Sequence, residues 1–126
     1  MSLGLYLHIP YCFSKCRYCD FYSHPGERGV PDAYVEALLR ELSRFAPEAP
    51  LQPDTLYFGG GTPSLLRPEQ AKRLIDAARP MPGAEITLEA NPETVTEESL
   101  AGFREAGVNR ISFGVQSARD TQLRTL

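Results

Sequence analysis

Residues 55–78 have the sequence TLYFGGGTPSLLRPEQAKRLIDAA, and this stretch decides the fold. The short apolar run from Thr55 to Phe58 predicts a strand, and the three glycines that follow it predict a turn. Pro68 to Ala78 predicts a helix, because proline suits the first helical position. The apolar side chains of this segment fall at the spacing of one helix face: Ala71, Leu74, Ile75 and Ala78. The stretch is therefore expected to form a strand, a glycine-rich loop and a helix in succession.

The same alternation of strand and helix extends over the rest of the chain. Further strands are predicted at Leu3–Ile9, Glu85–Ala90 and Arg110–Val115. Further helices are predicted at Pro31–Phe45, between the N-cap Thr96 and Gly107, and from Asp120 to Leu126, where the helix only opens. Strands that alternate with helices of this length form right-handed βαβ units, so we expect an α/β fold with a parallel sheet. Four parallel strands cannot close a barrel. We therefore expect one domain, residues 1–126, that forms the N-terminal part of something longer.

Composition narrows the class of protein. The chain has 126 residues, 42% of them hydrophobic and 23% charged, and a formal net charge of −3. These are the proportions of an ordinary globular domain. No apolar run approaches the length that spans a bilayer, and the Lys and Arg residues form no basic stripe for tracking phosphates. We expect a cytoplasmic protein that has no membrane span and binds no nucleic acid.

The three cysteines of the chain are Cys12, Cys16 and Cys19, spaced Cys-x-x-x-Cys-x-x-Cys directly after the first predicted strand. Three thiolates can hold three irons of a cubane cluster and leave the fourth iron open to a small molecule. Two other readings remain at this point. One is a zinc site in which His8 or His24 supplies the fourth ligand, and the other is a set of reduced cysteines without a metal.

Unusual residues follow each of the four predicted strands. The cysteine loop follows the first strand, Gly59–Pro63 the second, Glu89–Pro92 the third and Gln116–Ser117 the fourth. In α/β barrels the ligand site lies at the carboxyl ends of the strands, so these loops are expected to surround a single site. The glycines would let backbone approach a ligand, and their amides could bind an anion, although a tight turn explains them equally well. Glu89 could bind a ribose hydroxyl or an ammonium group, or form a structural salt bridge.

Together these motifs resemble the radical S-adenosylmethionine (SAM) proteins related to oxygen-independent coproporphyrinogen III oxidase. The resemblance covers essentially the whole chain. It is carried by YLHIPYC at 6–12, CRYC at 16–19, FGGGTPS at 58–64, EANP at 89–92, GVNRIS at 107–112 and GVQS at 114–117. It implies that the chain is the N-terminal part of a partial (β/α)6 radical SAM barrel, with about four parallel strands and flanking helices.

The resemblance also implies cofactors. A [4Fe-4S] cluster would be held by Cys12, Cys16 and Cys19, with SAM on the open iron. The residues that would line the SAM site are Tyr6, Tyr18, Gly60, Gly61, Thr62, Glu89 and Gln116. In such proteins an electron from the cluster cleaves SAM, and the adenosyl radical that results abstracts hydrogen from a substrate. The cofactors supply this chemistry, while the protein supplies position and exclusion of water.

One difference from the oxidases indicates which branch of this family the chain resembles. The true oxidases carry a further cysteine two residues after the third, where this chain has Phe21. In this respect the chain resembles the branch of HemW-type haem chaperones, which pass haem to acceptor proteins. The expected partners are then haem or a porphyrin, an unknown haem acceptor and an unknown electron donor. The alternative from the same family is oxidative decarboxylation of coproporphyrinogen III, and a small zinc-binding interaction module is a third possibility.

Overall fold

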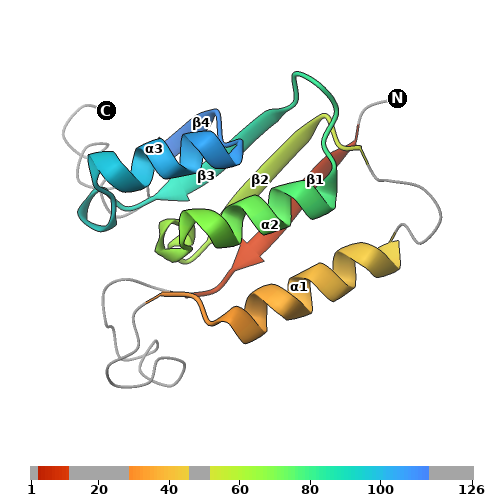
Figure 1. Cartoon of the computed structure of the whole chain (residues 1–126), viewed down its shortest axis with the longest axis horizontal. Coiled ribbons are helices and arrows are strands. Elements are labelled where there is room, and N and C mark those ends of the chain that lie inside the picture. The colour runs from red at the N-terminus through yellow and green to blue at the C-terminus, as the bar shows by residue number, and fades with distance from the viewer. Residues whose placement is uncertain (1–2, 12–28, 46–51, 114–126) are drawn as a thin grey trace, which may run out of the picture.

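The computed structural model describes residues 3–11, 29–45 and 52–113. In these residues a parallel four-stranded sheet has the order β1-β2-β3-β4, which is also the order along the chain (Figure 1). The strands are β1 (Gly4–Ile9), β2 (Thr55–Gly60), β3 (Glu85–Ala90) and β4 (Arg110–Phe113). The helices are α1 (Asp32–Phe45), α2 (Pro68–Ala78) and α3 (Glu97–Ala106), with short 3-10 turns η2 (Pro63–Leu65) and η3 (Pro92–Thr94).

The elements match the prediction closely wherever the structure describes the chain. The predicted α/β class and parallel sheet are confirmed. The main difference is that β2 does not end at Phe58 but continues through two glycines, because Gly59 and Gly60 pair with His8 and Ile9 of β1. The predicted end of the fourth strand at Val115 and the predicted helix opening at 120–126 lie outside the described residues.

The three helices cover one face of the sheet (Figure 1). Apolar side chains alternate along each strand and point to this face, as the pleat of a strand requires. They pack with apolar side chains of the helices into one core. The largest fully buried aliphatic and aromatic side chains of this core are Phe58, Phe103, Ile9, Leu56, Leu74, Leu88 and Val35. No helix among the described residues covers the opposite face of the sheet, which we call the open face.

The predicted limits of α3 are confirmed by its capping contacts. The Thr96 hydroxyl accepts a hydrogen bond from the Ser99 amide at 3.0 Å, and the Ser99 hydroxyl accepts one from the Thr96 amide at 2.9 Å. Gly107 ends the helix with a φ of 124°, a backbone conformation that favours glycine. These contacts fix the helix between the β3 and β4 strands.

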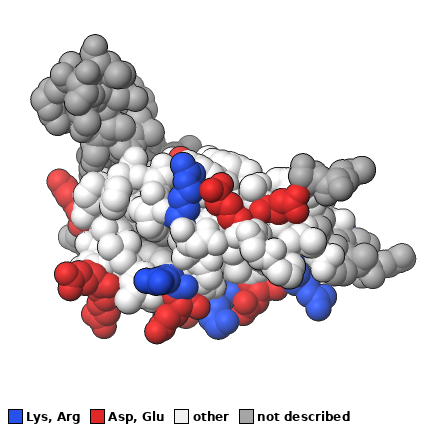
Figure 2. All heavy atoms as spheres, turned by 90° about the horizontal axis from the view of Figure 1, so that it is seen from above, with Lys and Arg blue, Asp and Glu red and all other residues white. Residues whose placement is uncertain are grey.

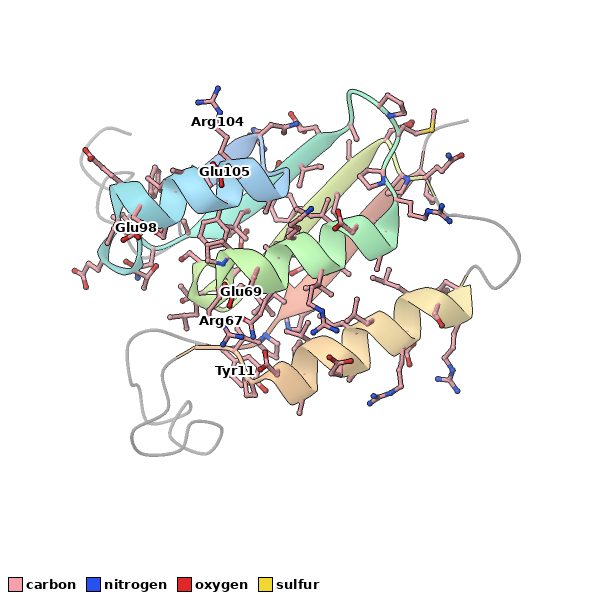
Figure 3. The ribbon with its side chains drawn as sticks, in the orientation of Figure 1. Tyr11, Arg67, Glu69, Glu98, Arg104 and Glu105 are labelled. Atoms are coloured by element: carbon pink, nitrogen blue, oxygen red, sulfur yellow. The ribbon has the colours of Figure 1, made fainter. Side chains whose placement is uncertain are left out.

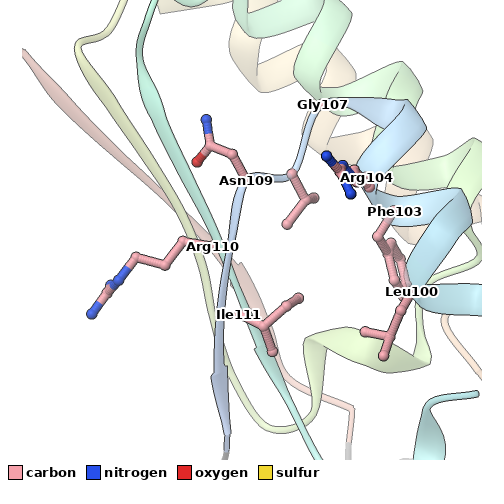
Figure 4. A pocket seen from close by; sticks show the side chains of 8 residues that line it. Leu100, Phe103, Arg104, Gly107, Asn109, Arg110 and Ile111 are labelled. Atoms are coloured by element: carbon pink, nitrogen blue, oxygen red, sulfur yellow. The ribbon is translucent and has the colours of Figure 1, made fainter. Parts of the chain in front are cut away.

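An open groove of about 600 Å³ lies between α3 and β4, where Leu100, Phe103 and Ile111 supply apolar side chains (Figure 4). In the same view Arg110 points away from this groove, toward the opposite side of the sheet. The groove therefore belongs to the helix-covered side of the molecule. It is separate from the open face.

Charged side chains of both signs are interspersed on the face shown in Figure 2. The described residues also form exposed ion pairs, including Arg73 with Glu36 at 2.8 Å and Lys72 with Asp76 at 3.1 Å. Such exposed pairs contribute little to stability. Among the described residues, no helix is both long and apolar enough to cross a membrane.

Candidate functional site

Four polar side chains gather on the open face of the first three strands. Tyr6 and His8 come from β1, Tyr57 from β2 and Glu89 from β3. In the sheet register Tyr6 pairs with Tyr57, and Tyr57 pairs with Thr87. Glu89 follows Thr87 by two residues on β3 and therefore lies on the same face of the sheet. Residues two apart in a strand share a face, which is why these groups lie together.

Two donors from β2 hold the Glu89 carboxylate. The Tyr57 hydroxyl donates to Oε2 at 2.7 Å, and the Gly60 amide donates to Oε1 at 3.2 Å. The hydrogen bond to Glu89, followed by partial burial, raises the pKa of Tyr57 above its ordinary value. Because each carboxylate oxygen has its own donor, the head group of Glu89 is fixed in position while it remains only half-buried. A carboxylate held in this way can accept further hydrogen bonds from a ligand.

The three glycines are each required for a different reason. A Cβ at Gly59 would lie 2.7 Å from Tyr6 Cε1 and 2.9 Å from Tyr57 Cε1, so both rings lean over this residue. Gly60 has a φ of 120°, and a Cβ there would lie 2.8 Å from the carbonyl oxygen of Ile9. A Cβ at Gly61 would lie 2.5 Å from the carbonyl oxygen of Tyr11. The loop thus lies directly against the end of β1.

The amides of this loop are already used within the chain. The Gly60 amide binds Glu89, the Gly61 amide donates to the Ile9 carbonyl at 2.8 Å, and the Thr62 amide donates to the Tyr11 carbonyl at 2.6 Å. The sequence left open that these amides bind an anion. Because they already donate to groups of the chain, the structure does not support that interpretation. The glycines instead provide a surface without side chains and hold the chain where it leaves β1.

Tyr34 of α1 supports the same end of β1. Its hydroxyl donates to the His8 carbonyl at 2.5 Å, and its ring meets Tyr11 edge-on with centroids 5.4 Å apart. His8 itself lies 3.3 Å from the Tyr6 hydroxyl through Nδ1. The position of Tyr11, the residue that precedes Cys12, is thus determined by both the glycine loop and α1.

The loops that follow β2 and β3 are joined by hydroxyl groups. The Ser64 hydroxyl lies 2.5 Å from that of Thr94 and accepts a hydrogen bond from the Asn91 amide at 3.2 Å. The Asn91 side chain accepts a hydrogen bond from the Glu93 amide at 2.8 Å. Asn91 and Ser64 therefore stabilise the loops that carry the site, a role that their motifs alone did not reveal.

The start of α1 is anchored to the start of α2. The buried Gln70 side chain donates to the Val30 carbonyl at 2.9 Å and to Asp32 at 2.8 Å, and it accepts from the Arg67 amide at 2.7 Å. Arg67 also forms an ion pair with Asp32 at 3.0 Å. Figure 3 shows Arg67 and Glu69 at the beginning of α2, with Tyr11 close to the beginning of α1. These contacts hold the pKa of Asp32 below its ordinary value, chiefly through Gln70 and Arg67.

The structure brings together several of the site residues expected from sequence. Gly60, Gly61 and Glu89 lie at or next to the carboxyl ends of β2 and β3, and Tyr6, nearer the middle of β1, places its ring over Gly59. Thr62 is nearby, but it is only 4% exposed. The expected residues that lie outside the described part of the chain are Cys12, Cys16, Cys19, Tyr18, Gln116 and His24. Tyr57 was missed, although its place two residues before Gly59 on the same strand face could have indicated it.

A family model described as the radical SAM superfamily matches residues 6–126. The chain belongs to this superfamily. Among curated relatives, heme chaperone HemW of Escherichia coli is 46% identical over 130 residues, and that of Mycobacterium tuberculosis is 43% identical over 132 residues. Each match covers 98% of this chain and 34% of the relative. The chain thus spans about a third of the length of these relatives.

A solved structure supports the same assignment. Coproporphyrinogen III oxidase (HemN) from Escherichia coli, a radical SAM enzyme, matches with a TM-score of 0.70 and 31% identity. The match covers 90% of this chain and 28% of that protein. The four parallel strands and their helices therefore correspond to the N-terminal part of a radical SAM barrel. The family in general uses a [4Fe-4S] cluster and SAM.

Proposed function

We propose that Cys12, Cys16 and Cys19 hold a [4Fe-4S] cluster and that SAM binds beside it at the carboxyl ends of the strands. Membership of the radical SAM superfamily and the donor set of three closely spaced thiols support the cluster. The cradle of glycines and the fixed carboxylate of Glu89 suit a ligand that carries hydroxyl and ammonium groups. The cluster and SAM, when bound, supply reductive cleavage of SAM.

Within this proposal the chain contributes position rather than redox chemistry. The residues proposed to line the SAM site remain Tyr6, Tyr18, Gly60, Gly61, Thr62, Glu89 and Gln116. Of these, Glu89 offers the most direct contact, because its carboxylate is oriented and open to a ligand. Thr62 supports the site through its backbone, since its amide holds the Tyr11 carbonyl. Tyr11 in turn carries the chain into Cys12.

We further propose that the protein containing this chain is a cytoplasmic haem chaperone that passes haem to an acceptor protein. The observation that carries this proposal is the identity of 46% and 43% to two curated proteins named heme chaperone HemW. Phe21, in place of the additional cysteine of the oxidases, agrees with it. The electron donor and the haem acceptor are partners to be identified by experiment.

Coproporphyrinogen III oxidation is the second candidate. It is favoured by the fold match to HemN at 31% identity. The two functions differ in their product. An oxidase converts coproporphyrinogen III in the presence of SAM and a reductant, whereas a chaperone releases haem unchanged to an acceptor.

The decisive experiment uses the longest natural polypeptide that contains this sequence, reconstituted under anaerobic conditions with iron and sulfide. Haem binding is followed by absorbance, and transfer is followed with an apo-haemoprotein as acceptor. We expect haem uptake and transfer without conversion of coproporphyrinogen III. A cluster-loaded protein that binds no haem would contradict the chaperone function, and formation of protoporphyrinogen would establish the oxidase instead.

A further inference from the structure

The Tyr57 side chain has no role in the family motifs considered above, yet it makes the shortest contact to Glu89. It lies on the open face, because its strand neighbours Leu56 and Phe58 are fully buried on the helix side. The 2.7 Å hydrogen bond connects its hydroxyl to a carboxylate on the adjacent strand. Hydrogen bonds to a charged group are stronger and more directional than those between neutral groups.

We propose that Tyr57 is a positioning residue that fixes the Glu89 carboxylate for binding of SAM. This inference rests on the proposed function, because it takes Glu89 as a SAM contact. A glutamate side chain has several rotatable bonds, and binding a ligand through a free one costs conformational entropy. With Tyr57 on Oε2 and the Gly60 amide on Oε1, this cost is met during folding rather than during ligand binding.

Tyr57 can serve this purpose because its own ring is held in place. The ring stacks on Tyr6, with centroids 6.0 Å apart and planes inclined by 16°. The absence of a side chain at Gly59 gives both rings room over the backbone. Tyr57 therefore presents its hydroxyl from a fixed ring on a rigid strand, which is the arrangement that positions a binding group accurately.

The surroundings of Tyr57 keep its hydroxyl protonated as a donor. The hydrogen bond to Glu89 raises the pKa of Tyr57, and partial burial raises it further. Ser112 and Arg110 on β4 act in the opposite direction, and on β1 Tyr6 lies beside the ring. Because the net shift is upward, the hydroxyl retains its proton at neutral and moderately alkaline pH.

The first test is Tyr57→Phe, which removes the hydroxyl and preserves the ring that stacks on Tyr6. We expect SAM to bind the reconstituted protein roughly tenfold more weakly, as measured by calorimetry. The matched control is Ser99→Ala, which also removes a hydroxyl hydrogen bond, in this case the one from the Thr96 amide at the start of α3. The control should lower the melting temperature without a comparable loss of SAM affinity. Equal SAM affinity in Tyr57→Phe and the unaltered protein would overturn the proposal.

A double-mutant cycle shows whether Tyr57 acts through Glu89. Glu89→Gln alone should weaken SAM binding, and adding Tyr57→Phe to it should cause little further loss. A tenfold loss from Tyr57→Phe in both backgrounds would show that the tyrosine acts by another route. This result would overturn the positioning role even though Tyr57 mattered for binding.

A spectrophotometric titration of the tyrosines provides a readout that needs no SAM. Glu89→Gln should lower the pKa of Tyr57 toward its ordinary value, and the group is identified by its absence in Tyr57→Phe. An unchanged titration would show that the pair does not form and would overturn the inference. Failure of the proposed function is distinguishable from these results, because the unaltered protein would then bind no SAM while the titration still changed.

Discussion

The Thr62 amide donates a hydrogen bond to the Tyr11 carbonyl at 2.6 Å, and this contact links the loop after β2 to the residue before Cys12. Gly61 makes the contact possible, because its Cα lies against the Tyr11 backbone where no side chain fits. The glycine loop therefore has a structural task at the entrance to the cysteine segment, in addition to the ligand contacts proposed for it.

Gly61→Ala tests this arrangement. The new methyl group would lie 2.5 Å from the Tyr11 carbonyl oxygen, so the backbone must move. We expect a loss of about 1–3 kcal/mol in stability and reduced iron content after reconstitution. The matched control is Gly83→Ala, where φ is 80° but the methyl group meets nothing within 4 Å. The control should lose about 1 kcal/mol through backbone strain and retain its iron. Equal iron contents in both variants would argue against a link between the contact of Gly61 with Tyr11 and iron binding.

Gln70→Ala should destabilise the fold by about 2–4 kcal/mol in chemical denaturation, because it leaves buried polar groups without partners. The Gln70 side chain is only 1% exposed and serves the Val30 carbonyl, Asp32 and the Arg67 amide. Lys72→Ala is the comparison on the same helix, since it removes only an exposed pair with Asp76. That change should cost less than about 1 kcal/mol. Similar losses in the two variants would mean that the Gln70 contacts contribute nothing.

The contacts of the Asp32 carboxylate with Gln70 and Arg67 should make the stability of the fold depend on pH in the acid range. Its pKa is lowered from 3.8 by Gln70 first and by Arg67 next, so the folded state favours the ionised form. The stabilisation is complete above pH 3.8 and is lost as the pH falls below this value through the lower folded pKa. Asp32→Asn keeps an acceptor for Gln70 but has no charge to titrate. Its stability should fall less than that of the unaltered protein between about pH 4 and 2. Parallel curves would contradict this assignment.

The fold was predictable because its local signals agree with one another. The apolar run of Thr55–Phe58 and the proline at position 68 both indicate the same βα unit, and Thr96 and Gly107 mark the limits of a helix. The end of β2 was not predictable in the same way. Glycine is depleted in strands, but pairing with His8 and Ile9 extends β2 through two glycines. Tertiary pairing overrides local preference at that point.

The site was only partly predictable for a different reason. Motifs indicate which residues follow the strands, and three of the residues they indicated, Tyr6, Gly60 and Glu89, lie on β1, β2 and β3. They do not reveal which donors are already used by the chain. The Gly61 and Thr62 amides bind backbone carbonyls, and Tyr57 binds Glu89, which lies on the neighbouring strand 32 residues later in the sequence. Such pairings depend on register, which no local pattern in this sequence specifies.

Cys16→Ala should remove cluster binding and leave the sheet intact. The residue belongs to the proposed ligand set, whereas the core that the described residues form is built from the strands and helices of the sheet domain. We expect loss of iron and of the brown colour, with far-ultraviolet circular dichroism unchanged. Ser14→Ala is a matched change within the same segment that should retain iron. Full iron content in Cys16→Ala, accompanied only by a lower melting temperature, would show that Cys16 is not a ligand.

The exposed edge of β4 predicts that the 126-residue chain associates. Within the described residues β4 pairs only with β3, and it carries Phe113, which is 52% exposed. An unpaired strand edge next to exposed apolar groups promotes pairing with another chain, and a lysine on such an edge opposes it. Phe113→Lys should therefore shift sedimentation toward the monomer. Phe45→Lys removes another exposed aromatic, 70% exposed at the end of α1, and should leave association unchanged. A monodisperse monomer in the unaltered chain, or equal effects of the two lysines, would show that the β4 edge is not responsible.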